Sequence, residues 1–206
     1  IGLSACYNSA GTYAKKHGYE WLLFLDQDTD FSDISVDDYV GAIASNPAYK
    51  MYVPLVKCGK YTMSPMKFKH AFALFSQRMY KGVTDIEDLS VINSGMCVSV
   101  DALQNCGGYN EKVFLDYSDH EFVRKFKKKY SQVYVLPRTI YQDYSAKSDA
   151  KDAALKRLVM FCESIRGCEK NTLLEKMEYS IPILKRTLAL VVRNRSFRAI
   201  PIAYKH

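Results

Sequence analysis

Two carboxylates follow directly on an apolar run near the start of the chain. Residues 21–25 read Trp-Leu-Leu-Phe-Leu, and Asp26 and Asp28 come next, one residue apart. The run is too continuous for a strand with one exposed face and too short for a helix, so it predicts a strand buried on both faces, as in the middle of a parallel sheet. Ligands of open α/β sheets bind at the carboxyl ends of strands. Two acids there can hold a hard divalent ion together with phosphate oxygens, although a polar loop that only ends a strand has the same pattern.

A second acidic group lies later, in the segment GGYNEKVFLDYSDHEF at residues 107–122. Phe122, Phe126 and Tyr130 recur at helical spacing, which predicts an amphipathic helix that begins near Asp119. A carboxylate at that place can accept the proton of a hydroxyl group within hydrogen-bond reach. The same carboxylate also stabilises the helix through the macrodipole, whether or not it takes part in a reaction.

The neighbours of Asp119 have structural explanations of their own. Ser118 and Glu121 have the spacing of a capping box, which accounts for Glu121 without any chemistry. His120 is expected on the solvated face of the helix. The pair Gly107-Gly108 has the composition of a turn.

Helices and strands alternate along the first two thirds of the chain. We expect helices within residues 1–17, over about 36–45, from Asp101 to Gly107 and from near Asp119, and strands at 21–25, 51–56, 94–100 and 133–136. Pro54 makes the second of these strands short or places it at an edge. Residues 58–92 show no clear period, so we expect a long, partly ordered lid or binding segment.

Beyond about residue 145 the pattern indicates helices only, at 155–165, at 172–180 and, after Pro182, at 183–193. Strands interleaved with helices and then a helical tail predict an α/β domain over residues 1–145 with a helical extension over 146–206. No run of apolar residues is long enough for a transmembrane helix.

Composition and charge narrow the class of protein. The chain is 48% hydrophobic with mixed charges, as in globular proteins. Its six cysteines contain no C-x-x-C pair and its four histidines are scattered, so we expect reduced thiols in a cytosolic protein in place of disulfides or zinc. The whole net charge of +7 comes from residues 151–206, which predicts a surface for an anionic partner.

Four stretches stand in an order that is typical of one family. GLSA at residues 2–5, with Asn8 and Gly11, precedes LFLDQDT; INSGMCVSVDAL at 92–103 follows, and then the segment at 107–122. Together they resemble the family 2 glycosyltransferases of GT-A (Rossmann-like) fold, most closely the rhamnosyltransferase-like branch, over roughly residues 1–145. The resemblance implies inverting transfer of a sugar, such as rhamnose, from a nucleoside-diphosphate donor to a hydroxyl group of a glycan or lipid-linked acceptor.

The resemblance also implies roles for single residues. Asp28 matches the ligand of a Mg²⁺ or Mn²⁺ ion that bridges the donor diphosphate, and Asp26 matches the acid that holds the ribose or a metal-bound water. Asp119 matches the catalytic base. Asn8 and Gly11 are expected on the side of the donor diphosphate and ribose. The residues expected around the sugar and acceptor are Asn93, Ser94, Gly95, Glu111 and Tyr117.

Two features depart from the family. Its members begin with strand–helix–strand units that bind the nucleotide base, and such units would lie before Ile1, so we expect an N-terminally incomplete domain. Many relatives also carry a histidine after the last strand, near the metal, where this chain has Tyr141-Gln142-Asp143-Tyr144. If the base-binding units are absent altogether, a catalytically inactive binding or scaffold module is the alternative.

A second enzyme class shares the first motif. Haloacid-dehalogenase-like phosphatases also have an apolar strand that ends in D-x-D, and the first Asp is their nucleophile. Their threonine stands four residues after that Asp, where this chain has Asp30, with Thr29 one residue early. The later lysine and paired-acid motifs of that class are not evident, so this is the weaker interpretation.

The segment 183–198 alternates apolar residues, among them Leu184 and Leu188, with cations such as Lys185 and Arg193. Such a helix can lie in a membrane interface with its cations against anionic headgroups, and a helix packed on the domain with a solvated basic face has the same pattern. Peripheral attachment at the inner face of the cell membrane would suit a cytoplasmic enzyme with a lipid-linked acceptor. Nucleic acid is not expected, because no aromatic platform or binding motif accompanies the cations.

Overall fold

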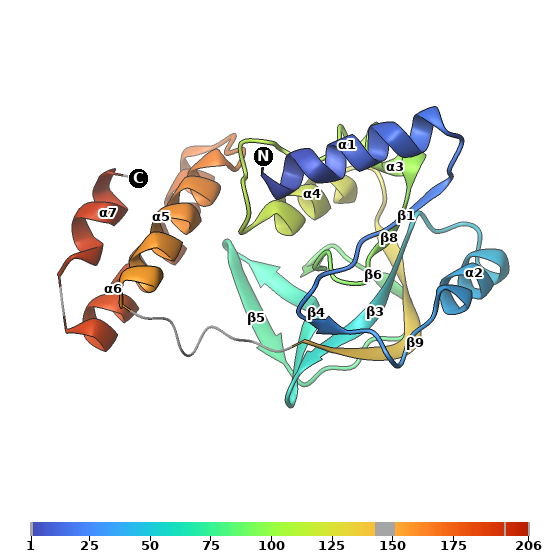
Figure 1. Ribbon diagram of the computed structural model, residues 1–206, viewed down its shortest axis with the longest axis horizontal. Helices are drawn as coiled ribbons and strands as arrows, with labels where there is room; N and C mark the ends of the chain where they lie inside the picture. The colour runs from blue at the N-terminus through green and yellow to red at the C-terminus, as the bar shows by residue number, and fades with distance from the viewer. Residues whose placement is uncertain (1, 143–150, 196, 206) are drawn as a thin grey trace.

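The computed structural model describes residues 2–142, 151–195 and 197–205 (Figure 1). The helices are α1 (Leu3–Lys16), α2 (Val36–Ser45), α3 (Val100–Asn105), α4 (Ser118–Lys127), α5 (Lys151–Gly167), α6 (Leu173–Asn194) and α7 (Ala199–Lys205). The strands are β1 (Trp21–Leu23), β2 (Thr29–Asp30), β3 (Met51–Cys58), β4 (Tyr61–Lys69), β5 (Phe72–Ser76), β6 (Gly82–Asp85), β7 (Leu89–Ser90), β8 (Cys97–Ser99) and β9 (Gln132–Gln142).

A single mixed sheet organises the described part of the chain. Its main path runs β1-β8-β3-β4-β5, and β9 lies beside β3 and also pairs with β2 and β6. β3 and β9 run parallel, whereas β3 pairs antiparallel with β8 and β4. The ends of β1 and β9 and the β4–β5 hairpin thereby surround one region, which becomes the site described below.

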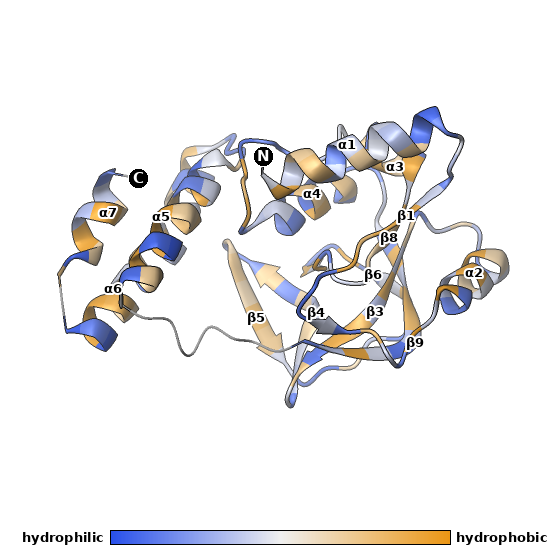
Figure 2. Cartoon of the chain, viewed as in Figure 1, coloured by the Kyte–Doolittle hydropathy of each residue, from blue (hydrophilic) through white to orange (hydrophobic). Residues whose placement is uncertain are grey.

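Helices cover both faces of this sheet (Figures 1 and 2). On one face, Phe122 and Phe126 of α4 and Leu103 of α3 are fully buried in the main core. On the other face, Tyr39 of α2 packs in a smaller cluster with Tyr52. The helices expected over 36–45 and from near Asp119 are therefore confirmed, because in each the apolar spacing faces the sheet.

The strand expected at 21–25 is present but differs in length and place. β1 ends at Leu23 and lies at one end of the sheet, antiparallel to β8, so the expected position inside a parallel sheet is wrong. The apolar run is continuous because both faces of this segment still contact apolar residues. Leu22 and Phe24 pack in the main core, and Trp21 and Leu23 pack with the cluster beneath α2.

Two further expectations about the sheet are wrong. β3 is central despite Pro54, because its register with β9 shifts between Val53 and Leu55 and the missing N–H falls at this irregularity. Residues 58–92 are not an unpatterned lid but contain β4, β5, β6 and β7. Burial along β4 follows no strict alternation, so the sequence shows no period of two.

The tail helices form their own layer beside the domain (Figure 1). Leu158, Cys162 and Ile165 of α5 form a core with residues of α6 and α7, and Val113 joins it from the first part of the chain. Pro182 does not separate two helices, since it lies inside the continuous α6. The expected boundary between residues 145 and 146 lies outside the described residues.

The cysteine prediction and the hydropathy prediction can both be compared with this structure. All six cysteines are unpaired and four are buried, while Cys6 is exposed. None of the described helices combines the length and apolar content that crossing a membrane requires.

Candidate active site

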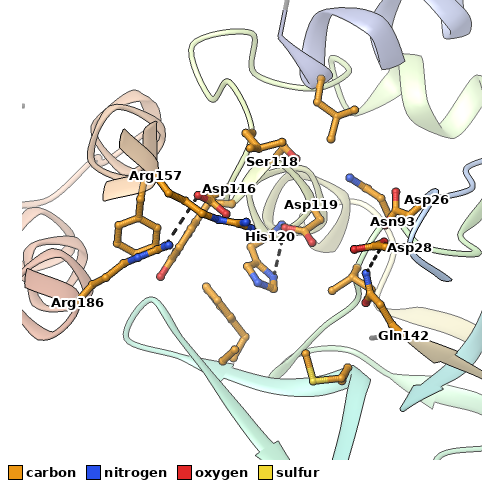
Figure 3. Close-up of a pocket in the computed structure, with 18 residues that line it drawn as sticks. Asp26, Asp28, Asn93, Asp116, Ser118, Asp119, His120, Gln142, Arg157 and Arg186 are labelled. Atoms are coloured by element: carbon orange, nitrogen blue, oxygen red, sulfur yellow. Dashed lines mark hydrogen bonds and ion pairs between the residues drawn. The ribbon is translucent and has the colours of Figure 1, made fainter. Parts of the chain in front are cut away.

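A pocket of about 460 Å³ opens where the sheet meets α4, α5 and α6 (Figure 3). Its walls come from the loop after β1, the β4–β5 hairpin, the start of α4, the end of β9 and the tail helices α5 and α6. The polar and charged side chains that line it are Asp26, Asp28, Asn93, Asp116, Tyr117, Ser118, Asp119, His120, Gln142, Arg157 and Arg186. Residues from both predicted acidic segments thus line one cavity.

The loop that carries the acidic pair is fixed at both of its ends. At its start, Phe24 N donates to Met96 O and Gly95 N donates to Phe24 O, both at 2.9 Å. At its end, β2 pairs with the last residues of β9. There Gln142 Nε2 donates to Asp28 Oδ1 at 3.2 Å, which links the exposed Asp28 carboxylate to the sheet.

The carboxylates of this pocket act on one another. Burial, together with the negative charges of Asp28 and Asp119, raises the pKa of the Asp26 carboxyl to about 6. Asp26 therefore lies in the field of two other acids with too little positive charge nearby. A cation bound here would relieve that repulsion and lower the pKa of Asp26.

Asp119 is held at the start of α4 by an unusual turn. Tyr117, the N-cap residue, has the left-handed backbone angles φ 70° and ψ 1°, a conformation that costs a non-glycine residue about 1 kcal/mol. Its hydroxyl donates to Ala71 O of the β4–β5 turn at 2.7 Å, and its ring contacts Phe161 of α5. Asp119 Oδ1 accepts a hydrogen bond from His120 N at 2.7 Å.

The expected capping box is wrong. Tyr117 takes the N-cap position, so Ser118 is already the first helical residue. Glu121 is buried, and its Oε1 accepts from Arg124 Nη2 at 3.1 Å and from Glu169 N at 3.0 Å. This carboxylate ties α4 to the segment just after α5 and does not cap α4.

The expectation that His120 is solvated is also wrong. Its side chain is only 11% exposed and lines the pocket. Nδ1 lies 2.7 Å from Ser90 Oγ, and the imidazole stacks on Phe68 with 4.1 Å between ring centroids. Burial lowers the pKa of His120, so the ring is neutral at neutral pH.

Of the three consecutive residues 93–95 expected around the sugar, only the first lines the pocket. Asn93 lines the pocket, and its Oδ1 accepts from Tyr109 Oη at 2.6 Å. Ser94 Oγ lies 2.7 Å from Thr29 Oγ1 and so links this loop to β2. Gly95 has φ +74°, a left-handed conformation that favours glycine. Ser94 and Gly95 thus position the loop and are not among the residues that line the pocket.

Asn8, Gly11 and Glu111 also lie outside the pocket lining. Asn8 Nδ2 donates to Glu111 Oε1 at 2.9 Å, and its Oδ1 accepts from Tyr109 N at 2.7 Å. A Cβ atom at Gly11 would lie 2.8 Å from Leu103 Cδ2, so glycine permits the close packing of α1 on α3. Asn8 and Glu111 thus hold α1 against the segment that leads to α4, and Gly11 lets α1 pack on α3.

Two arginines of the pocket were not anticipated. Arg157 comes from α5, and Arg186, which the sequence suggests as part of a basic outer face, comes from α6. Arg186 Nη1 lies 4.0 Å from Asp116 Oδ2. Burial raises the pKa of the Asp116 carboxyl. The positive charges of Arg186 and Arg157 act in the opposite direction but do not cancel this rise. No local pattern reveals either arginine, because the packing of the tail on the domain brings them here.

The fit of a metal ion can be judged from the donors present. Among the described residues, no three or more His, Cys, Asp and Glu side chains surround one possible metal position. Asp26 and Asp28 supply hard oxygen donors, and Mg²⁺ is commonly held by one or two carboxylates together with substrate phosphates and water. Burial raises the pKa of Asp26 most, and the repulsion from Asp28 and Asp119 adds to it; a bound cation would relieve that repulsion, so the two acids fit such an ion.

This architecture is a mixed α/β fold similar to a GT-A glycosyltransferase domain. A solved structure with this likeness is GalNAc-T7 with UDP, GalNAc and Mn²⁺, which matches 88% of this chain with a TM-score of 0.58 and 12% sequence identity. The chain spans 37% of the length of the GalNAc-T7 chain. No family model and no curated protein matches the sequence. The likeness establishes the fold alone and does not extend to the rhamnosyltransferase-like branch.

Proposed function

We propose that this chain is an inverting, metal-dependent glycosyltransferase that transfers a sugar from a nucleoside-diphosphate donor to a hydroxyl group of a glycan or lipid-linked acceptor. The observation that carries the proposal is that Asp26, Asp28 and Asp119 line one pocket of a GT-A-like fold and interact electrostatically. Rhamnose is the sugar that the sequence resemblance suggests. GalNAc-T7 supports a nucleotide-sugar donor in general terms, because its structure holds UDP, GalNAc and Mn²⁺.

Asp119 has one task in this reaction, and Asp26 and Asp28 share another. Asp119 takes the proton of the acceptor hydroxyl while that oxygen attacks the anomeric carbon. The bond from this carbon to the diphosphate oxygen breaks on the opposite side, so the configuration inverts. Asp28 and Asp26 would hold a Mg²⁺ or Mn²⁺ ion, whose positive charge would stabilise the departing diphosphate. Neutral His120, with Nδ1 3.9 Å from Asp119 Oδ1, leaves the charge of the base uncompensated.

A transfer assay tests this proposal. The chain is incubated with Mn²⁺, a UDP-, dTDP- or GDP-sugar, and either soluble oligosaccharides or polyprenyl-phosphate-linked sugars, and the released nucleoside diphosphate is measured. We expect acceptor-dependent release from one donor class that is abolished by EDTA. Asp119→Asn should reduce it by about 10²–10⁴-fold, whereas Asp33→Asn, at an exposed acid outside the pocket, should retain the rate.

Two other outcomes of this assay have definite meanings. Equal rates in Asp119→Asn and the unmodified chain would contradict the role of Asp119 as the base. Nucleotide binding without transfer from any donor to any acceptor would favour the alternative of an inactive binding or scaffold module.

We also propose that the protein is cytoplasmic and that α6 lies against the anionic inner face of the cell membrane. Six apolar side chains spaced three or four residues apart run along α6 with exposed fractions between 47% and 77%: Leu173, Met177, Ile181, Leu184, Leu188 and Val192. Exposed cations at Lys176, Lys185 and Arg193 belong to the same helix. An apolar stripe with neighbouring cations is the pattern of an interfacial helix. Residue 196 of the expected segment 183–198 lies outside the described residues.

A further inference from the structure

The pocket has charges of opposite sign in different parts. Asp26, Asp28 and Asp119 come from the domain, whereas Arg157 and Arg186 reach the same cavity from the tail helices (Figure 3). A pocket lined only by acids would repel an anionic acceptor. The two arginines therefore change which acceptors the pocket can hold.

Arg186 is held in place while its donors stay available. Its guanidinium lies over the ring of Phe161, with 4.2 Å between Cζ and the ring centroid. The 4.0 Å between its Nη1 and Asp116 Oδ2 is an ion pair but too long for a hydrogen bond. Within the described chain, Asp116 Oδ2 is buried without a hydrogen-bond partner. The guanidinium is thus oriented by stacking and by charge, without using its N–H groups on this acid.

Arg157 stands one α5 turn before Phe161 and points into the cavity beside Asp116 and His120 (Figure 3). Its guanidinium is not hydrogen-bonded to any residue that the structure describes, and its charge reaches Asp116 through space. Each guanidinium offers five N–H donors in a planar fork that fits the oxygens of a phosphate in pairs. Two such groups at one end of a 460 Å³ pocket are a suitable receptor for a phosphoryl oxyanion.

We propose that Arg157 and Arg186 form the acceptor subsite and bind a phosphoryl group carried by the acceptor. This inference rests on the proposed transferase function, since it assigns the end of the pocket near α5 and α6 to the acceptor. It narrows the acceptor to a phosphate-bearing molecule, such as a sugar linked to a lipid phosphate. The helix that presents the exposed apolar stripe also supplies Arg186, so a lipid-borne phosphate would approach the pocket from the side of α6.

Binding of small probes without metal tests the subsite by itself. Glucose 1-phosphate and the neutral methyl glucoside are titrated in EDTA, and binding is followed by calorimetry. We expect glucose 1-phosphate to bind about tenfold or more tightly than methyl glucoside. Arg157→Gln combined with Arg186→Gln should remove this preference, and Lys156→Gln, at an exposed cation next to Arg157, should leave it unchanged. Glucuronic acid and inorganic phosphate are titrated in the same way, to show whether a sugar carboxylate or free phosphate is sufficient for binding.

Definite results would overturn the subsite. These are equal binding of the charged and neutral sugars, an unchanged preference in the double variant, the same loss in Lys156→Gln, or a preference for glucuronic acid over glucose 1-phosphate. If Arg186→Gln fails to fold, Arg157→Gln alone tests the proposal, because Arg157 is exposed. Arg186→Lys keeps the positive charge but loses the planar fork, so it should lose part of the preference for glucose 1-phosphate. Asp28→Ala should abolish nucleotide binding with Mn²⁺ and keep glucose 1-phosphate binding, so failure of the donor site and of this subsite are separate results.

Discussion

Gln142 Nε2 donates to Asp28 Oδ1 at 3.2 Å and connects the end of β9 with the acidic loop. The contact is supported by the ladder between β2 and β9, in which Gln142 is opposite Thr29. Without it, the exposed Asp28 side chain would have no partner of its own in the described structure. Gln142, the last residue of β9, therefore stands close to the acids, in the stretch where the resemblance leads one to expect a histidine.

Gln142→Ala is expected to weaken Mn²⁺-dependent nucleotide binding by about threefold to tenfold, since one typical intramolecular hydrogen bond contributes about 1 kcal/mol. The measurement is a calorimetric titration of the nucleotide in the presence of Mn²⁺. Gln132→Ala, at the exposed first residue of β9, is the matched control and should bind like the unmodified chain. Equal affinity of both variants would mean that Gln142 does not orient Asp28.

Asp26→Asn should stabilise the metal-free protein near neutral pH but not at about pH 4. The carboxyl has a pKa of about 6 in the folded chain against an ordinary value of 3.8, so the folded state binds its proton more tightly. The stability that this group contributes is complete below the ordinary pKa and is lost as the pH rises to about 6. Asparagine is neutral throughout and avoids that loss.

Thermal melting in EDTA at several pH values measures this effect. The difference in Tm between Asp26→Asn and the unmodified chain should grow from about pH 4 to about pH 6 and then stay constant. Asp33→Asn should show no such trend, because Asp33 is exposed and outside the pocket. A lower Tm for Asp26→Asn at neutral pH would show that its carboxylate has a stabilising partner.

The helices were predictable because the signals that specify them are local. The apolar spacing of residues 118–127 and the capping residues Ser35 and Asp38 determine where α4 and α2 form. The capping box expected at Ser118 does not form, because Tyr117 adopts a left-handed conformation and its hydroxyl donates to the distant Ala71 O. A local pattern therefore failed where a tertiary contact sets the backbone.

Strand order and the far side of the pocket depend on long-range contacts. Nothing near residue 21 shows that β1 pairs antiparallel with β8, almost eighty residues away. Arg157 and Arg186 have ordinary helical surroundings in the sequence, and only the packing of α5 and α6 on the domain brings them near Asp116. The acidic pair was easier to locate, because a strand end and two nearby acids are adjacent in the chain.

The apolar stripe of α6 should bind anionic membranes. In flotation assays we expect the chain to associate with vesicles that contain phosphatidylglycerol and to associate less with phosphatidylcholine alone. Leu184→Glu with Leu188→Glu should abolish association, because both side chains are more than half exposed on the stripe. Val40→Glu, at an exposed apolar position on α2, is the control. If the stripe instead makes dimers, light scattering will show a doubled mass that the double variant loses.

The most direct test of the central claim is thermal melting with UDP, dTDP and GDP, each with and without Mn²⁺. A ligand at about 100 times its Kd stabilises the folded state by about 2.7 kcal/mol, which corresponds to roughly 5–10 °C for a chain of this size. We predict a rise in Tm with one nucleotide that requires Mn²⁺, disappears in Asp28→Ala and persists in Asp33→Ala. The absence of a shift with every nucleotide, or a shift that Asp28→Ala leaves intact, would contradict a donor site at Asp26 and Asp28.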